Sequence, residues 1–131
     1  MKSNILMTCS AAYLACVGLA LSFIPQEIGV FFSIESNIVT TLMLQLFGAL
    51  NLGFAMLNWM IRGGRIGGIY NKPIATANFM HFGVGALALL KIIFEPTTNP
   101  YFIVPITIVY TVFGIAFGYL FMNNPKDTNS Q

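Results

Sequence analysis

Four long apolar segments, separated by short connections, constrain the fold of this chain more than any other feature. They cover residues 5–24, 38–61, 74–94 and 101–122. A helix needs roughly 20 residues to cross the hydrocarbon core of a bilayer, so each segment is long enough to span a membrane. Helix-breaking residues mark the boundaries, namely Pro25, Gly63, Gly64, Pro73, Pro96 and Pro100. We therefore predict an all-α protein: a polytopic membrane four-helix bundle with antiparallel up-down topology.

The composition argues against a soluble domain. Hydrophobic residues make up 56% of the 131 residues and charged residues 8%, whereas soluble domains average roughly 45–50% and about 25%. A soluble core of this size cannot bury so much apolar surface, so we expect the bilayer to cover it. No connection is long enough to form a core of its own, and we expect one domain over residues 1–131. A net charge of +2 is too small to predict nucleic-acid binding.

The basic residues predict the orientation, because they collect on the cytoplasmic side of membrane proteins. One side of the predicted bundle carries Lys2, Arg62, Arg65, Lys72 and Lys126. The opposite side carries Lys91 together with Glu27, Glu35 and Glu95. We therefore expect both termini in the cytoplasm. The first segment is expected to remain as a span rather than to be cleaved as a signal peptide, since its apolar run is long and three further spans follow.

Small and polar residues recur every three or four positions on the two central segments, which places them on one face of each helix. The second segment carries Gly48, Asn51, Ala55 and Asn58, and the third carries Asn78, His81, Gly85 and Ala88. Because these segments are antiparallel, Asn58 is expected at the depth of Asn78, and Asn51 near the depth of His81. The sequence thus predicts two polar layers that face each other inside the membrane.

These polar layers have three interpretations. In the structural one, the amides and the imidazole hydrogen-bond between helices, each bond contributing about 0.5–2 kcal/mol. In the functional one, Asn51, Asn58, Asn78 and His81 line a site for a ligand or a proton, because polar groups at this depth are costly and often functional. In the third, the stripe faces a second subunit. Since a zinc site needs three or four ligands and His81 is the only histidine, we expect no metal and no cofactor.

The connections offer two further features. Arg62, Arg65 and Lys72 lie in or beside a glycine-rich connection whose spacing matches neither a P-loop nor a dinucleotide fingerprint. We expect these three basic residues to contact anionic lipid headgroups. The connection 25–37 carries apolar residues between two glutamates and predicts a short amphipathic helix in the outer interface.

Glycines mark expected helix contacts. Gly114 and Gly118 form a G-x-x-x-G pair, a spacing that lets two helix backbones approach closely. Gly48 and Gly85 lie on the polar stripes and are expected to allow the same close approach. The spacing does not say whether the neighbouring helix belongs to this chain or to another.

The stretches LFGALNLGFAMLNW (46–59) and GGIYNKPIATAN (67–78), followed by His81, resemble a pattern in small uncharacterised four-helix membrane proteins of bacteria. The resemblance covers the central hairpin. It implies the four-span topology and a bacterial inner membrane, and it implies no activity.

Together these features predict a small integral membrane protein that acts by association, as an accessory subunit of a membrane complex or as a homo-oligomer. Its expected partners are membrane lipids and other transmembrane helices. The alternative is a binding or transport module for a small polar molecule or a lipid headgroup, with its pocket in the central hairpin. An enzyme is the least favoured class, because no nucleophile and base, and no pair of carboxylates, occur at usable spacing.

Overall fold

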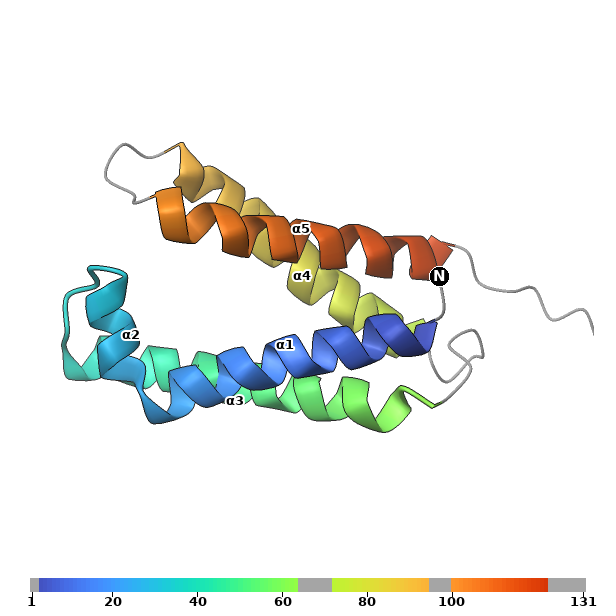
Figure 1. Cartoon of the computed structure of the whole chain (residues 1–131), viewed down its shortest axis with the longest axis horizontal. Helices are drawn as coiled ribbons and strands as arrows, with labels where there is room; N and C mark the ends of the chain where they lie inside the picture. The colour runs from blue at the N-terminus through green and yellow to red at the C-terminus, as the bar shows by residue number, and fades with distance from the viewer. Residues whose placement is uncertain (1–2, 64–71, 95–99, 123–131) are drawn as a thin grey trace, which may run out of the picture. The chain divides into compact units, whose positions relative to one another are not determined.

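The computed structural model describes residues 3–63, 72–94 and 100–122 (Figure 1). Within these ranges the chain forms helices and no strand, so the all-α prediction is confirmed for them. The helices are α1 (Ser3–Phe23), α2 (Pro25–Phe31), α3 (Ile38–Ile61), α4 (Lys72–Ile93) and α5 (Pro100–Met122).

The four long helices coincide with the four apolar segments to within two residues at each end. By length and composition, all four are able to cross a membrane. The short helix α2 lies in the connection 25–37, where the sequence predicts a short helix. The apolar pattern and the helix breakers were therefore sufficient to predict the secondary structure.

Local signals explain how the chain turns between α1 and α3. Pro25 is the first residue of α2, a position where its missing N–H is not needed. Ser33 ends α2 in the left-handed conformation (φ 56°), and the N–H of Ile34 donates to the carbonyl oxygen of Gly29 at 2.8 Å, as in a Schellman motif. Asn37 then caps α3, because its side-chain oxygen accepts a hydrogen bond of 2.8 Å from the backbone N–H of Thr40.

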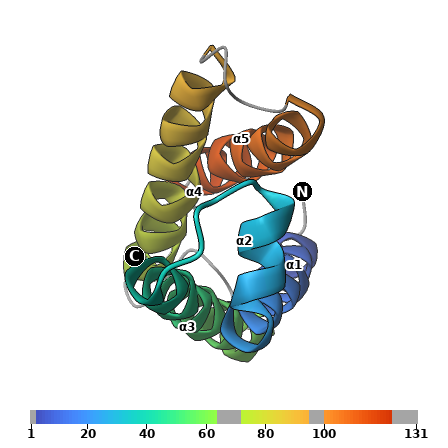
Figure 2. The ribbon, with the colours of Figure 1, turned by 90° about the vertical axis from the view of Figure 1, so that its left-hand side faces the viewer.

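Two compact units account for the contacts of the chain, Met1–Gly63 and Gly64–Gln131. In the first unit, α1 and α3 pack antiparallel along their length, and α2 lies at the end where they are joined (Figures 1 and 2). In the second unit, α4 and α5 form an antiparallel hairpin. The single domain expected from the sequence stays a prediction.

The α1–α3 pair is held at a close contact between two glycines. A Cβ atom on Gly48 would lie 2.9 Å from the carbonyl oxygen of Gly18 and 2.6 Å from Oγ of Ser22. A Cβ atom on Gly18 would likewise lie 2.9 Å from the carbonyl oxygen of Gly48. The two backbones therefore touch directly, and any side chain at either position would push the helices apart.

The α4–α5 pair combines a backbone contact with aromatic packing. A Cβ atom on Gly114 would lie 3.4 Å from Cα of Gly83, so the helices also approach closely here. Beside this contact, the fully buried ring of Phe82 lies between α5 rings, with centroid distances of 4.9 Å to Phe113 and 5.8 Å to Phe117. Aromatic pairs at these distances add stabilisation beyond the apolar area they bury.

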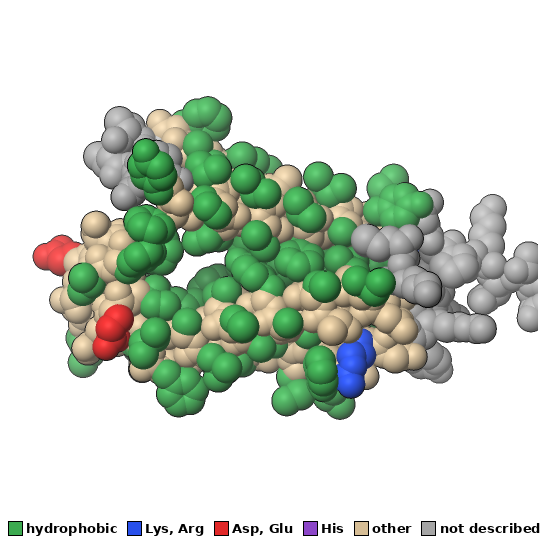
Figure 3. Space-filling view, viewed as in Figure 1, with side chains coloured by type: hydrophobic (Ala, Val, Ile, Leu, Met, Phe, Trp, Pro, Cys, Tyr) green, Lys and Arg blue, Asp and Glu red, His purple; other side chains and the backbone are tan. Residues whose placement is uncertain are grey.

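Apolar side chains cover the sides of the helices on the face shown in Figure 3. In the first unit, the described acidic side chains, Glu27 and Glu35, lie at the end where α2 joins the long helices. Arg62 lies at the opposite end, directly after α3. The described charges of this unit thus lie at its two ends, with the apolar surface between them.

The Gly18–Gly48 contact predicts that Gly48→Ala destabilises the first unit by about 1–3 kcal/mol, the range for overpacking a tight contact. Gly53→Ala, in the same helix, is the matched control because no atom beyond its chain neighbours and the adjacent helix backbone lies within 4 Å of its added Cβ. Gly53→Ala should leave stability unchanged or raise it by up to about 1 kcal/mol, since alanine favours helix more than glycine does. Unfolding of both variants in detergent, followed by circular dichroism, measures the difference. Equal stability of the two variants would contradict the close contact.

Candidate functional site

The polar stripe predicted on α3 is the buried face of that helix. The buried residues of α3 are Gly48, Asn51, Ala55 and Asn58. Every large apolar side chain of the helix is at least partly exposed, which reverses the arrangement of a soluble amphipathic helix. Such a helix suits surroundings that are as apolar as its exposed side chains.

Asn58 connects α3 to α1. Its Nδ2 donates a hydrogen bond of 3.0 Å to Oγ of Ser10, and this hydroxyl donates one of 3.1 Å to the carbonyl oxygen of Met7. Both Asn58 and Ser10 are fully buried. Ser10 is not among the residues predicted from the sequence. Its hydroxyl group, within an apolar segment, was the signal that could have identified it.

The amides of Asn51 and Asn78 bond to their own helices. Nδ2 of Asn51 donates to the carbonyl oxygen of Phe47 at 2.8 Å, and Nδ2 of Asn78 donates to that of Ile74 at 3.0 Å. The side-chain oxygen of Asn51 is buried and accepts no hydrogen bond within the described part of the chain. A buried acceptor without a donor lowers the stability of the fold by about 1–3 kcal/mol. A donor from outside the described residues would remove this penalty.

The buried face of α4 differs from the predicted stripe. It consists of Ala75, Asn78, Phe82 and Ala86. His81 and Gly85 are half-buried, and Ala88 is exposed and does not belong to this face. The stripe predicted from small and polar residues diverges from this face after Asn78, because the large ring of Phe82 supplies the packing instead.

His81 lies against aromatic rings of the second unit. Its ring centroid is 5.1 Å from that of Phe82 and 5.8 Å from that of Tyr110. Tyr110 also packs on Gly85, where a Cβ atom would lie 2.6 Å from the ring. The absence of a side chain at Gly85 therefore makes room for the tyrosine beside the histidine.

The four candidate ligand-binding residues are divided between the two units. Asn51 and Asn58 belong to the first, and Asn78 and His81 belong to the second. The expected alignment of two polar layers stays a prediction. Within the first unit, Asn58 makes a hydrogen bond from one helix to another. This is the kind of bond that the structural interpretation of the stripe expects.

Two of the three candidate headgroup-binding residues lie over aromatic rings. The guanidinium carbon of Arg62 lies 3.5 Å from the centroid of the Trp59 ring, and Nη1 of Arg62 donates to the Trp59 carbonyl oxygen at 2.8 Å. Nζ of Lys72 lies 5.7 Å from the centroid of the Phe121 ring. Both distances are within the range of a cation–π interaction. Arg65 lies outside the described residues.

The G-x-x-x-G pair of α5 faces α4 of the same hairpin. Gly114 contacts Gly83, and a Cβ atom on Gly118 would lie 3.0 Å from the ring of Phe79. Both glycines therefore make room for α4. The sequence left open whether their partner lies in this chain, and in the structure it does.

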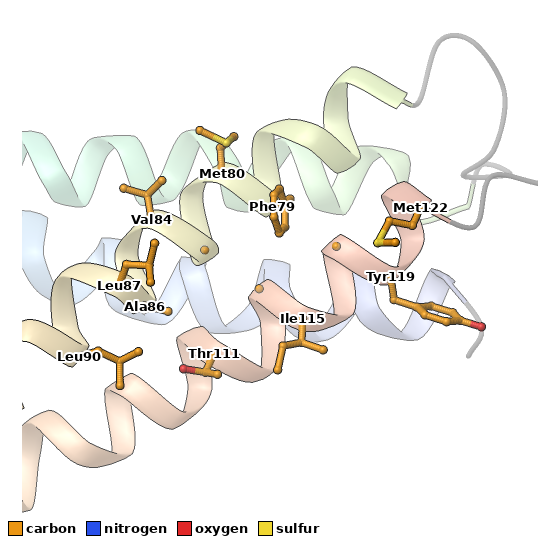
Figure 4. Close-up of a pocket in the computed structure, with 13 residues that line it drawn as sticks. Phe79, Met80, Val84, Ala86, Leu87, Leu90, Thr111, Ile115, Tyr119 and Met122 are labelled. Carbon is orange, nitrogen blue, oxygen red and sulfur yellow. The ribbon is translucent and has the colours of Figure 1, made fainter.

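Each helix pair has an apolar groove along its side. The groove between α4 and α5 has a volume of about 680 Å³ (Figure 4). Gly83, Gly114 and Gly118 contribute to its lining, beside larger side chains such as Val84 and Ile115. The groove between α1 and α3 has a volume of about 510 Å³ and is lined by alanines of α1 together with α3 residues that include Trp59. The described residues of both grooves are uncharged.

No protein family, curated protein or solved structure matches the chain. Among the described residues, no group of three or more histidine, cysteine, aspartate or glutamate side chains is arranged to hold a metal ion. The features that remain are the amide stripe of α3, the aromatic surroundings of His81 and the two apolar grooves.

The hydrogen bond from Asn58 to Ser10 predicts an energetic coupling between α3 and α1. In a double-mutant cycle of Asn58→Ala and Ser10→Ala, we expect a coupling of about 0.6 kcal/mol, and at most about 1.7, the range that holds for hydrogen bonds inside membrane proteins. The measurement is the unfolding free energy of the four proteins in detergent. Thr8→Ala is the matched control, because the Thr8 hydroxyl donates to its own helix at the Asn4 carbonyl oxygen. Coupling of Asn58 to Thr8 as strong as that to Ser10 would refute the assignment.

Proposed function

We propose that the chain is a multi-pass membrane protein that acts by lateral association with lipids and with other transmembrane helices. The long helices contain 21, 24, 22 and 23 residues. At 1.5 Å per residue they are about 31–36 Å long, which suits the ~30 Å hydrocarbon core of a bilayer. Their sides expose large apolar residues, including Leu46 (61% exposed) and Ile115 (69% exposed). Lipid would cover this surface without the free-energy penalty that water imposes.

The proposed topology is an antiparallel up-down bundle with both termini in the cytoplasm of a bacterial cell, across the inner membrane. The described charges of the first unit support it, because Arg62 lies at one end of the unit and the two glutamates at the other. In this topology Arg62 and Lys72 lie on the cytoplasmic side, as the positive-inside rule favours.

This topology predicts which sites react from outside the cell. In a background with Cys9→Ala and Cys16→Ala, a membrane-impermeant maleimide should label Ser36→Cys in intact cells. It should label Gly63→Cys only after the membrane is permeabilised. Both positions are exposed, so burial does not limit the reaction at either. The reverse pattern would contradict the proposed orientation, and labelling of both sites in intact cells would contradict the membrane location.

Association is favoured because packing within each unit leaves most of the surface of α3 and α4 exposed. In the most apolar windows of α3 and α4, only 17% of the residues are buried within the chain. The glycine contacts lie inside the hairpins, so the outward faces carry large side chains. Since the connections between the spans are short, these outward faces are the main surface on which a partner can act.

Association predicts discrete cross-links in the membrane. A photoreactive amino acid at Leu19, Met43 or Val112 would test the exposed faces of α1, α3 and α5, because these side chains are 50%, 65% and 60% exposed. We expect at least one position to give a defined product that mass spectrometry identifies as a second copy or as one recurring membrane protein. Samples that are not irradiated are the control. Products with lipid alone at all three positions would contradict association.

The second candidate function is binding or transport of a small polar molecule or a lipid headgroup by Asn51, Asn58, Asn78 and His81. One observation favours it, namely the buried side-chain oxygen of Asn51, which lacks a donor among the described residues. His81→Leu separates the two functions in the same cells. With association, any phenotype of the variant should follow its abundance, whereas a phenotype lost at normal abundance would favour the binding site.

A further inference from the structure

The groove between α4 and α5 is apolar along its length, and it is about as long as one leaflet of a bilayer is thick. On α4 its lining extends from Phe79 to Leu90. At 1.5 Å per residue, this distance is about 16 Å, or about half of the ~30 Å hydrocarbon core. Gly83 and Gly114 keep the groove open at its middle, because neither has a side chain to fill it. Its shape and polarity suit a single extended hydrocarbon chain.

A positive charge lies beyond one end of the groove, separated from its lining by one aromatic ring. Phe79, which lines the groove, stacks on Phe121 with a centroid distance of 6.5 Å and an interplanar angle of 6°. The ammonium group of Lys72 lies 5.7 Å from the centroid of the same Phe121 ring. Tyr119 lines this end as well, and in Figure 4 its hydroxyl points away from the other lining side chains. A cation and a phenol hydroxyl thus lie where the hydrocarbon lining ends.

We propose that this groove binds the acyl chain of an anionic phospholipid, with the lipid phosphate beside Lys72. The proposal rests on the membrane location proposed above. In that topology Lys72 lies at the cytoplasmic surface, and the chain from its headgroup would run inward over Gly83 and Gly114. The apolar lining accepts the acyl chain, and the ammonium group selects an anionic headgroup over a zwitterionic one.

The first unit repeats this arrangement with different residues. Its groove is lined by Trp59, and the guanidinium of Arg62 lies over that indole ring. Nη1 of Arg62 bonds to a backbone carbonyl oxygen, which holds the guanidinium in place while its other N–H groups can still reach a phosphate. Because α3 and α4 are consecutive antiparallel spans in the proposed topology, Arg62 and Lys72 lie at the same membrane surface. A cation held by an aromatic ring at the end of an apolar groove therefore occurs in both units.

Quenching by brominated lipids tests the proposal. In a Trp59→Phe background, Ile115→Trp places one fluorophore in the α4–α5 groove, and Val84→Trp is a second reporter in case the first variant folds poorly. The protein is reconstituted in phosphatidylcholine vesicles that contain phosphatidylglycerol, with the same brominated chains on one lipid or the other. We expect the groove reporter to prefer phosphatidylglycerol by about fivefold, the ratio expected for one basic residue at the surface. In Lys72→Gln this preference should disappear.

Two controls separate the possible failures. Met43→Trp, in the same Trp59→Phe background, reports an exposed α3 position outside both grooves, and it should be quenched equally by the two lipids. Arg62→Gln should leave the preference at the groove reporter unchanged. Three results at the groove reporter would each overturn the proposal. They are equal quenching by both lipids, a preference for phosphatidylglycerol that survives Lys72→Gln, and no quenching because a second copy covers the groove. No quenching at Met43→Trp either would instead overturn the membrane location.

Discussion

Direct contact between helix backbones is the interaction on which both helix pairs depend. In lipid, apolar side chains gain little by leaving their surroundings, so helices associate through close packing and hydrogen bonds. Gly18 and Gly48 bring the backbones of α1 and α3 into direct contact. Gly114 lies close to Gly83 in the α4–α5 pair, where an added Cβ would be at ordinary contact distance, 3.4 Å. On α3 small and polar residues form the buried face, and the large apolar side chains lie on the exposed faces. The proposed association with lipids and helices follows from this division.

Beyond the glycine contacts, the two units stabilise their helix pairs in different ways. The first unit uses small and polar groups, with Asn58 bonded to Ser10 across the pair and the amide of Asn51 bonded within α3. The second unit uses aromatic rings, in which Phe82 packs between Phe113 and Phe117. A hydrogen bond in an apolar medium demands a defined geometry, whereas stacked rings fill space. The amide face of α3 is therefore the more specific feature, and the side-chain oxygen of Asn51 is its one described acceptor without a donor.

The grooves connect this packing with the proposed interactions. The groove between α4 and α5 runs past Gly83 and Gly114, whereas the groove between α1 and α3 is lined by alanines of α1 and by residues of α3. In the first unit the guanidinium of Arg62 lies over Trp59, which lines the groove. In the second unit the ammonium group of Lys72 lies over Phe121, which stacks on the lining residue Phe79. The residues that pack the hairpins thus also shape the surface that the surrounding lipid would meet.

The sequence by itself determined the helices and the composition of the buried face of α3. Apolar runs bounded by proline and glycine specify helices, and the spacing of Gly48, Asn51, Ala55 and Asn58 specifies one face, since both effects act within a few turns of one chain segment. Only the tertiary structure decided that Ser10 is the partner of Asn58, that Gly114 contacts Gly83, and that Phe82 replaces the expected small residues on α4. These pairings depend on the register between helices far apart in sequence, and that register is set by how all side chains pack together rather than by any local pattern.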